Sequence, residues 1–144
     1  MNFSTIALAH LVFTLAMVGL MTAVQLTIYP AFREVPESSF SAYVTKHGEA
    51  IMRPLVLFAP AEVVLALVLW LTAPSGNGII TFVSGLLLVA AWVTTAVWYA
   101  PLHGRLATEP YDQAKIEQLI NTNWFRTIIW WVRGGLAIWI LVRA

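Results

Sequence analysis

The chain contains no cysteine among its 144 residues. This absence excludes disulfide bonds, thiol catalysis and iron–sulfur ligation by cysteine. Charged residues are scarce, at 10%, whereas soluble domains carry about 25%. The formal net charge is only +1, so we expect no nucleic-acid partner. No phosphate-binding loop, serine triad or zinc signature is present, and no common catalytic motif therefore points to a function.

Long apolar runs are what the sequence does contain, and 60% of its residues are hydrophobic. Four runs, at about residues 6–28, 51–71, 79–100 and 121–142, approach the roughly 20 residues that cross a bilayer as a helix. We predict one all-α domain, an integral membrane four-helix bundle in contact with the lipid bilayer. The first run is too long for a signal peptide and has no basic residues before it, so we expect it to be retained as a span.

Two longer connections, at about residues 30–50 and 102–122, are predicted to contain short interfacial helices. In the first, Phe40, Tyr43, Val44 and His47 recur at helical spacing. This pattern predicts an amphipathic helix whose apolar face carries His47 toward the bundle. Gly48 is expected to end that helix.

Prolines are expected to shape the spans. Pro30 and Pro101 should end the first and third spans, because proline disfavours a continuing helix. Pro60 lies inside the second span, two residues before Glu62. We expect a kink there, with space beside the carboxyl group.

Charge asymmetry predicts the orientation. Four spans place both longer connections on one side of the membrane and both termini on the other. Most basic residues lie on the side of the connections: Arg33, Lys46, Arg53, Arg105, Lys115 and Arg126. The positive-inside rule therefore predicts a multi-pass protein of the bacterial inner membrane with its longer connections in the cytoplasm.

Two ionisable residues lie near the middle of spans, Glu62 in the second and Arg133 in the fourth. A charge at that depth costs roughly 2.5–3.5 kcal/mol on insertion scales, so we expect the two to pair. The pair is either a structural clamp that fixes helix register, or a site in which Glu62 accepts a proton or binds a metal. Arg126 lies on the same helical face as Arg133. It would leave spare positive charge for an anionic headgroup, carboxylate or enolate.

Polar and aromatic residues also gather toward the side of the longer connections. They are Gln25, Tyr29, His47, Tyr99, His103, Asn123, Trp124 and Arg126. Three interpretations remain open: anchors to lipid headgroups, a metal or haem site, and a pocket for an organic substrate. Trp124 and Trp130 would line such a pocket. No His-x-x-His or His-x-x-x-His spacing is present, so the cofactor is left unknown.

Two further features of the first span have simpler interpretations. His10 suits a helix–helix hydrogen bond or an interface position, with axial haem ligation as the alternative. Met17 and Met21 suit core packing, with a soft copper path as the alternative.

Several motifs together resemble a known family. The motifs are Gln25-x-x-x-Tyr29-Pro30, His47 with Arg53 and Glu62, Pro101-Leu102-His103-x-x-Leu106 with Asp112, and Asn123-Trp124-x-Arg126-Thr127-x-x-Trp130-x-x-Arg133. Over nearly the whole chain the pattern resembles the small four-span bacterial membrane proteins described as anthrone-oxygenase-like. The resemblance implies a four-span fold and cofactor-light oxygenation of aromatic polyketides.

Three functions remain to be compared. The first is an oxygenase- or oxidoreductase-like enzyme for a small hydrophobic, aromatic or quinone-like molecule. In it, Glu62 or His47 would remove a proton and Arg126 and Arg133 would hold the anion. It predicts a closed cavity among spans one, two and four with Glu62 in its wall.

The second function is a non-catalytic scaffold or accessory subunit, which predicts a fully packed centre and a direct Glu62–Arg133 bond. The third is a transporter or channel, which four spans could form only as an oligomer. Gly85, Gly134 and Gly135 would allow the close helix approach of a homo-oligomer or larger membrane complex.

Overall fold

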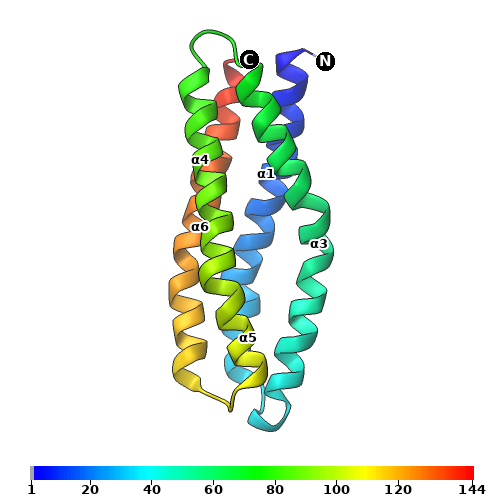
Figure 1. Ribbon diagram of the computed structural model, residues 1–144, viewed down its shortest axis with the longest axis vertical. Helices are drawn as coiled ribbons and strands as arrows, with labels where there is room; N and C mark the ends of the chain where they lie inside the picture. The colour runs from blue at the N-terminus through cyan, green and yellow to red at the C-terminus, as the bar shows by residue number, and fades with distance from the viewer. Residues whose placement is uncertain (1) are drawn as a thin grey trace.

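The computed structural model describes residues 2–144 as an up-down-up-down four-helix bundle (Figure 1). Four continuous helical stretches are long and apolar enough to cross a membrane: Phe3–Glu34, Glu37–Leu71, Gly78–Thr108 and Gln113–Val142. Both termini lie at the end of the bundle that holds the turn at residues 72–77 (Figure 1). The predicted all-α, multi-pass membrane bundle is confirmed.

The four stretches are built from six α-helices and shorter turns. The α-helices are α1 (Phe3–Ala23), α2 (Tyr29–Ala31), α3 (Glu37–Leu71), α4 (Gly78–Thr94), α5 (Ala100–Thr108) and α6 (Gln113–Val142). Neighbours pack in the order α1, α3, α4, α6 and back to α1, so that α3 and α6 face each other across a diagonal of the bundle.

The separate interfacial helices predicted for the two connections are not found. The segment with Phe40 and Val44 is the first part of α3, and both side chains are buried against the bundle. Helix α3 passes through Gly48, whose missing side chain leaves open space around it. The segment before Asn121 likewise belongs to α6, which begins after Asp112. The Asp112 carboxylate accepts the backbone N–H of Ala114 at 2.9 Å, as an N-cap does.

Pro30 and Pro101 also do not end their helices. Each follows a π-helical turn, Val24–Ile28 before Pro30 and Thr95–Tyr99 before Pro101. In these turns the backbone N–H of Tyr29 bonds to the carbonyl of Val24, and that of Ala100 bonds to the carbonyl of Thr95. One extra residue per turn lets the helix continue past the ring of the proline. The π turns also change the direction in which the following side chains point.

Pro60 lies within α3, which remains one helix from Glu37 to Leu71. The helix bends away from the bundle partway along its length in Figure 1. The missing N–H of a proline inside a helix accounts for such a bend.

Two glycines are required by the backbone. Gly76 has a φ of 106° in the turn that joins α3 to α4, a conformation that favours glycine. Gly134 lies where α6 packs closely on α1, and a Cβ atom there would be 3.2 Å from Cγ2 of Val18. Gly135, one residue further, has no neighbour within 4 Å of such an atom. Gly134 thus serves packing within one chain.

We expect Gly134→Leu to destabilise the bundle by about 1–3 kcal/mol, because the added side chain overpacks the α1–α6 contact. The matched substitution Gly135→Leu faces open space and should leave stability unchanged or raised. Thermal unfolding of both purified variants in detergent checks this. Equal melting temperatures for the two variants would contradict the close α1–α6 packing.

Candidate functional site

The centre of the bundle holds a buried ion pair between Glu62 of α3 and Arg133 of α6. Nη2 of Arg133 donates to Oε2 of Glu62, and both side chains are fully buried. The two residues come from helices that face each other diagonally, so the bond crosses the bundle axis. The direct pairing expected from the sequence is therefore present.

The other two long helices complete this ion pair. Thr14 of α1 donates its hydroxyl to Oε1 of Glu62 at 2.6 Å. Ser84 of α4 accepts from Nη1 of Arg133 through its carbonyl oxygen. His10 lies beside the pair, with Nε2 3.5 Å from Nη2 of Arg133. We call Thr14, Glu62, Ser84 and Arg133 the clamp, because these four residues join all four long helices at one level.

The clamp leaves Glu62 with no free carboxylate oxygen. One oxygen accepts from Thr14 and the other from Arg133. A buried acid and base paired in this way leave no carboxylate oxygen of Glu62 free to bind a metal or a ligand. His10 is used here in a contact between helices, which agrees with the simpler of its two interpretations.

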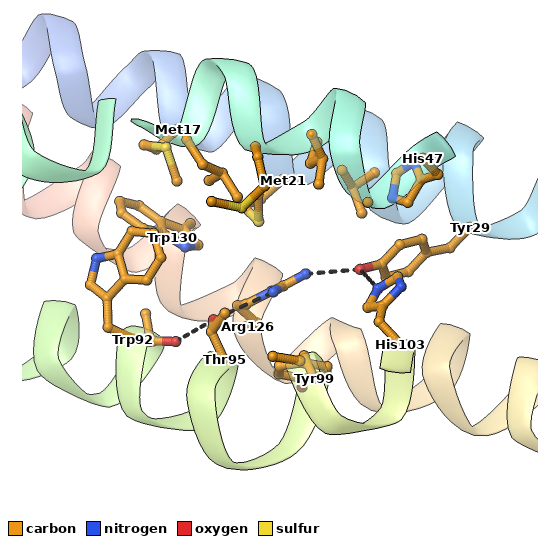
Figure 2. A pocket seen from close by; sticks show the side chains of 17 residues that line it. Met17, Met21, Tyr29, His47, Trp92, Thr95, Tyr99, His103, Arg126 and Trp130 are labelled. Carbon is orange, nitrogen blue, oxygen red and sulfur yellow. Dashed lines mark hydrogen bonds between the residues drawn. The ribbon is translucent and has the colours of Figure 1, made fainter. Parts of the chain in front are cut away.

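A cavity of about 250 Å³ lies between the clamp and the end of the bundle with the connections at residues 35–36 and 109–112. Its volume is near the lower limit of small-molecule pockets, roughly 300–1,000 Å³. Its lining side chains come from all four helical stretches of the bundle (Figure 2). The polar and aromatic residues of its wall are Tyr29, His47, Trp92, Thr95, Tyr99, His103, Arg126 and Trp130. We call this cavity the pocket.

The expected place of Glu62 in the cavity wall is not what the structure shows. Glu62 does not line the pocket. Trp130 does line it, and the guanidinium of Arg133 lies 5.1 Å from the centroid of the Trp130 ring. Trp130 is therefore in contact with both the clamp and the pocket.

Three polar side chains form a connected group in the pocket wall (Figure 2). The hydroxyl of Tyr29 lies 2.7 Å from Nε2 of His103, and Nη2 of Arg126 lies 3.2 Å from the same hydroxyl. Because a guanidinium can only donate, the Tyr29 oxygen accepts from Arg126. In the tautomer of His103 that carries its proton on Nδ1, Nε2 accepts from the Tyr29 hydroxyl; in the other tautomer, Nε2 donates to it. We call Tyr29, His103 and Arg126 the triad.

His47 adds a second imidazole to this end of the pocket. Its ring stacks on that of His103, with centroids 5.7 Å apart and planes 26° apart. It also meets the ring of Tyr29 edge-on, at 6.0 Å. The prediction that His47 points toward the bundle is confirmed, although His47 belongs to the first part of α3 and not to the separate interfacial helix expected from the sequence.

Arg126 is buried, with 7% of its surface exposed, and has no acidic partner. Its guanidinium lies 4.4 Å from the ring centroid of Tyr99, and Nη1 lies 3.4 Å from Oγ1 of Thr95. Tyr99 in turn donates its hydroxyl to the carbonyl of Thr122, at 2.7 Å. Nε of Arg126 has no hydrogen-bond partner in the part of the chain described.

Three of the residues expected at this site lie outside the pocket. Asn123 donates to Oε1 of Gln25 at 2.8 Å, and Gln25 donates to the carbonyl of Ile120 at 3.1 Å. These two amides join α1 to α6 instead of facing a ligand. Trp124 lies on the outer face of α6, where its ring meets Trp131 edge-on at 5.8 Å.

The apolar part of the pocket was not assigned to a site from the sequence. Met17 and Met21 of α1 line it, together with Ile51, Met52 and Leu55 of α3. Their helical spacing is equally typical of core packing, which is why pattern alone could not identify them. Trp92 and Thr95 belong to a polar and aromatic stripe along the third span that the sequence does reveal.

The exposed lining residues of the pocket indicate that it reaches the surface between α3 and α5. Two of its lining residues there, Met52 and Ala100, are exposed, and Gly48 contributes no side chain. The flanking surface is apolar, with Val56 65% and Val97 68% exposed. In a membrane-spanning bundle, an opening surrounded by such side chains faces lipid. Within residues 2–144, no three His, Asp or Glu side chains lie close enough to hold a metal ion.

Breaking the clamp should destabilise the protein strongly. We expect Glu62→Leu or Arg133→Leu alone to cost about 3–5 kcal/mol, because each leaves an unpaired buried charge. The double variant Glu62→Leu/Arg133→Leu should lose far less than the sum. The free energies of unfolding of the wild-type protein, the two single variants and the double variant, measured in detergent, give this coupling. Additive losses would show that the two side chains do not stabilise each other.

Comparison with known proteins adds no relative to this picture. No protein-family model, no curated protein and no solved structure matches the chain. The chemistry of the pocket is therefore inferred from its own contacts.

Proposed function

We propose that this integral membrane protein binds a small hydrophobic, aromatic or quinone-like molecule and removes a proton from it. In an oxygenase- or oxidoreductase-like enzyme this step would precede oxidation of the resulting anion, with molecular oxygen as the oxidant. The observation that carries the proposal is the triad, which places a base, a phenol and a guanidinium in the wall of an otherwise apolar pocket. The resemblance to anthrone-oxygenase-like proteins supports an aromatic ligand with an acidic C–H bond.

The triad supplies the parts that such a reaction needs. Nε2 of His103 can take a proton through the hydroxyl of Tyr29, as a general base does. Arg126 can stabilise an oxygen that gains negative charge when the proton leaves. Trp92 and Trp130 offer flat apolar surfaces to an aromatic body.

These roles differ from those expected from the sequence. The proposed base is His103 with Tyr29, with His47 beside them, instead of Glu62. Arg126 alone is proposed to hold the anion, since Arg133 is occupied in the clamp. Gln25, Asn123 and Trp124 support the surrounding helices.

A non-catalytic scaffold remains the second candidate, and the closed clamp favours it. That function also predicts a fully packed centre, whereas the pocket lies directly beside the clamp. Catalysis of proton transfer distinguishes the two candidates.

Anthrone is a suitable probe, because loss of a proton from its methylene carbon gives an aromatic enolate. We expect the purified protein to accelerate deuterium exchange at this carbon in D₂O, with His103→Gln and Tyr29→Phe reducing the rate by about 100-fold or more. Proton nuclear magnetic resonance measures the exchange as the loss of the methylene signal. Arg105→Gln, an exposed change outside the pocket, is the control. Exchange no faster than in empty detergent would favour the scaffold.

We also propose that the ligand enters from the bilayer through the opening between α3 and α5. Gly48→Leu should narrow this opening while leaving the helix intact, because leucine is a better helix former than glycine. Gly135→Leu, at a helical glycine with equally open surroundings, is the matched control.

The expected result is slower anthrone exchange for Gly48→Leu at low anthrone concentration and an unchanged rate for Gly135→Leu. Unchanged exchange in both variants would place the route elsewhere.

For the orientation, we propose that the end with the connections at residues 35–36 and 109–112 lies in the cytoplasm of a bacterial inner membrane. Basic residues support this, since Arg33, Lys46, Arg105 and Lys115 lie at that end and Arg143 lies at the other. The lack of native cysteine makes single-cysteine labelling straightforward.

In spheroplasts, we expect a membrane-impermeant maleimide to label Ser75→Cys, in the turn between α3 and α4, and to spare Ser38→Cys until the cells are lysed. The opposite pattern would reverse the orientation.

A further inference from the structure

We infer that the molecule bound in the pocket is an organic anion, a small aromatic acid whose single negative charge on oxygen neutralises Arg126. This inference rests on the proposed function, because it names the chemical class of the ligand for the same pocket. Its support is the charge balance of the bundle interior.

Within residues 2–144, three acidic or basic side chains are buried: Glu62, Arg126 and Arg133. Glu62 and Arg133 form the clamp and cancel each other. Arg126 is left, and no Asp or Glu lines the pocket around it. One uncompensated positive charge therefore lies inside the bundle, at the wall of the pocket.

A shift of a proton within the triad does not remove this charge. If the proton of Tyr29 moves to His103, the phenolate and the imidazolium cancel each other, and Arg126 still leaves a total of one positive charge. The partners of Arg126 are the neutral oxygens of Tyr29 and Thr95, at 3.2 and 3.4 Å. The missing negative charge must then come from outside the chain.

The shape of the site selects the kind of anion. Nε of Arg126 is buried without a partner, and a guanidinium recognises planar oxygen anions such as a carboxylate or an ionised enol. Beyond Arg126 the wall is formed by Met21, Trp92 and Trp130. A cavity of about 250 Å³ suits a small fused aromatic ring system that carries one charged oxygen group near Arg126. A phospholipid headgroup with its two acyl chains is much larger.

The test compares two ligands that differ in charge but hardly in shape. The first, 2-hydroxy-1,4-naphthoquinone, is ionised at neutral pH, and the second, 2-methoxy-1,4-naphthoquinone, is neutral. Both quench tryptophan fluorescence, and Trp92 and Trp130 line the pocket. Titration of the purified protein in detergent at pH 7 gives both affinities, with empty micelles as the correction for partition.

We expect wild-type protein to bind the ionised quinone at least about tenfold more tightly than the methoxy compound. Arg126→Gln should abolish this preference and Arg126→Lys should retain part of it, while Arg105→Gln should leave it unchanged. Acidification of the wild-type sample until the hydroxyquinone is neutral should also abolish the preference. This last measurement decides the question even if Arg126→Gln does not fold.

The possible failures are distinct. Saturable and equal binding of both quinones would overturn the anion inference and leave the proposed pocket function in place. No saturable quenching by either quinone would overturn the proposed binding function itself. A preference for the anion that persists in Arg126→Gln would place the anion site away from Arg126.

Discussion

The bond between Glu62 and Arg133 is the constraint on which the rest of this bundle depends. It crosses the bundle diagonal between α3 and α6, and Thr14 and Ser84 add the two remaining long helices. A charge in the middle of a membrane span is costly and almost always has a partner inside the bundle. The bond joins α3 to α6 at one depth. Side chains nearer the connections at residues 35–36 and 109–112 meet in the same bundle and form the pocket.

Pro30 and Pro101 are each associated with a backbone irregularity beside the pocket. Each follows a π-helical turn, one before Pro30 and one before Pro101, and the walls of the pocket include residues of both turns. The extra residue in each turn shifts the following side chains around the helix axis. Of the hydrogen-bonded pair of the triad, Tyr29 follows the first turn directly, and His103 lies about one helical turn beyond the second. The π-helical turns that precede Pro30 and Pro101 thus also help to place the polar side chains of the pocket.

The clamp and the triad also divide the charged residues between two tasks. Arg133 has a carboxylate partner that neutralises its charge, although its Nε has no hydrogen-bond partner within residues 2–144. Arg126 has only neutral partners, so its charge remains available to a ligand. Trp130 lines the pocket and also contacts the guanidinium of Arg133, so it belongs to both sites.

The sequence alone determined the four apolar spans, the pairing of Glu62 with Arg133 and the inward direction of His47. These follow from the length of the apolar runs, the cost of a charge in a bilayer and helical periodicity. It also brought Tyr29, His103 and Arg126 to one end of the bundle. Only the tertiary structure decided that α3 and α6 run unbroken through the expected interfacial segments and that Glu62 lies outside the pocket. Only it showed that Asn123 and Gln25 bind each other. The reason is that periodicity states which face of a helix is apolar, whereas the partner of each polar atom depends on how neighbouring helices are rotated against one another.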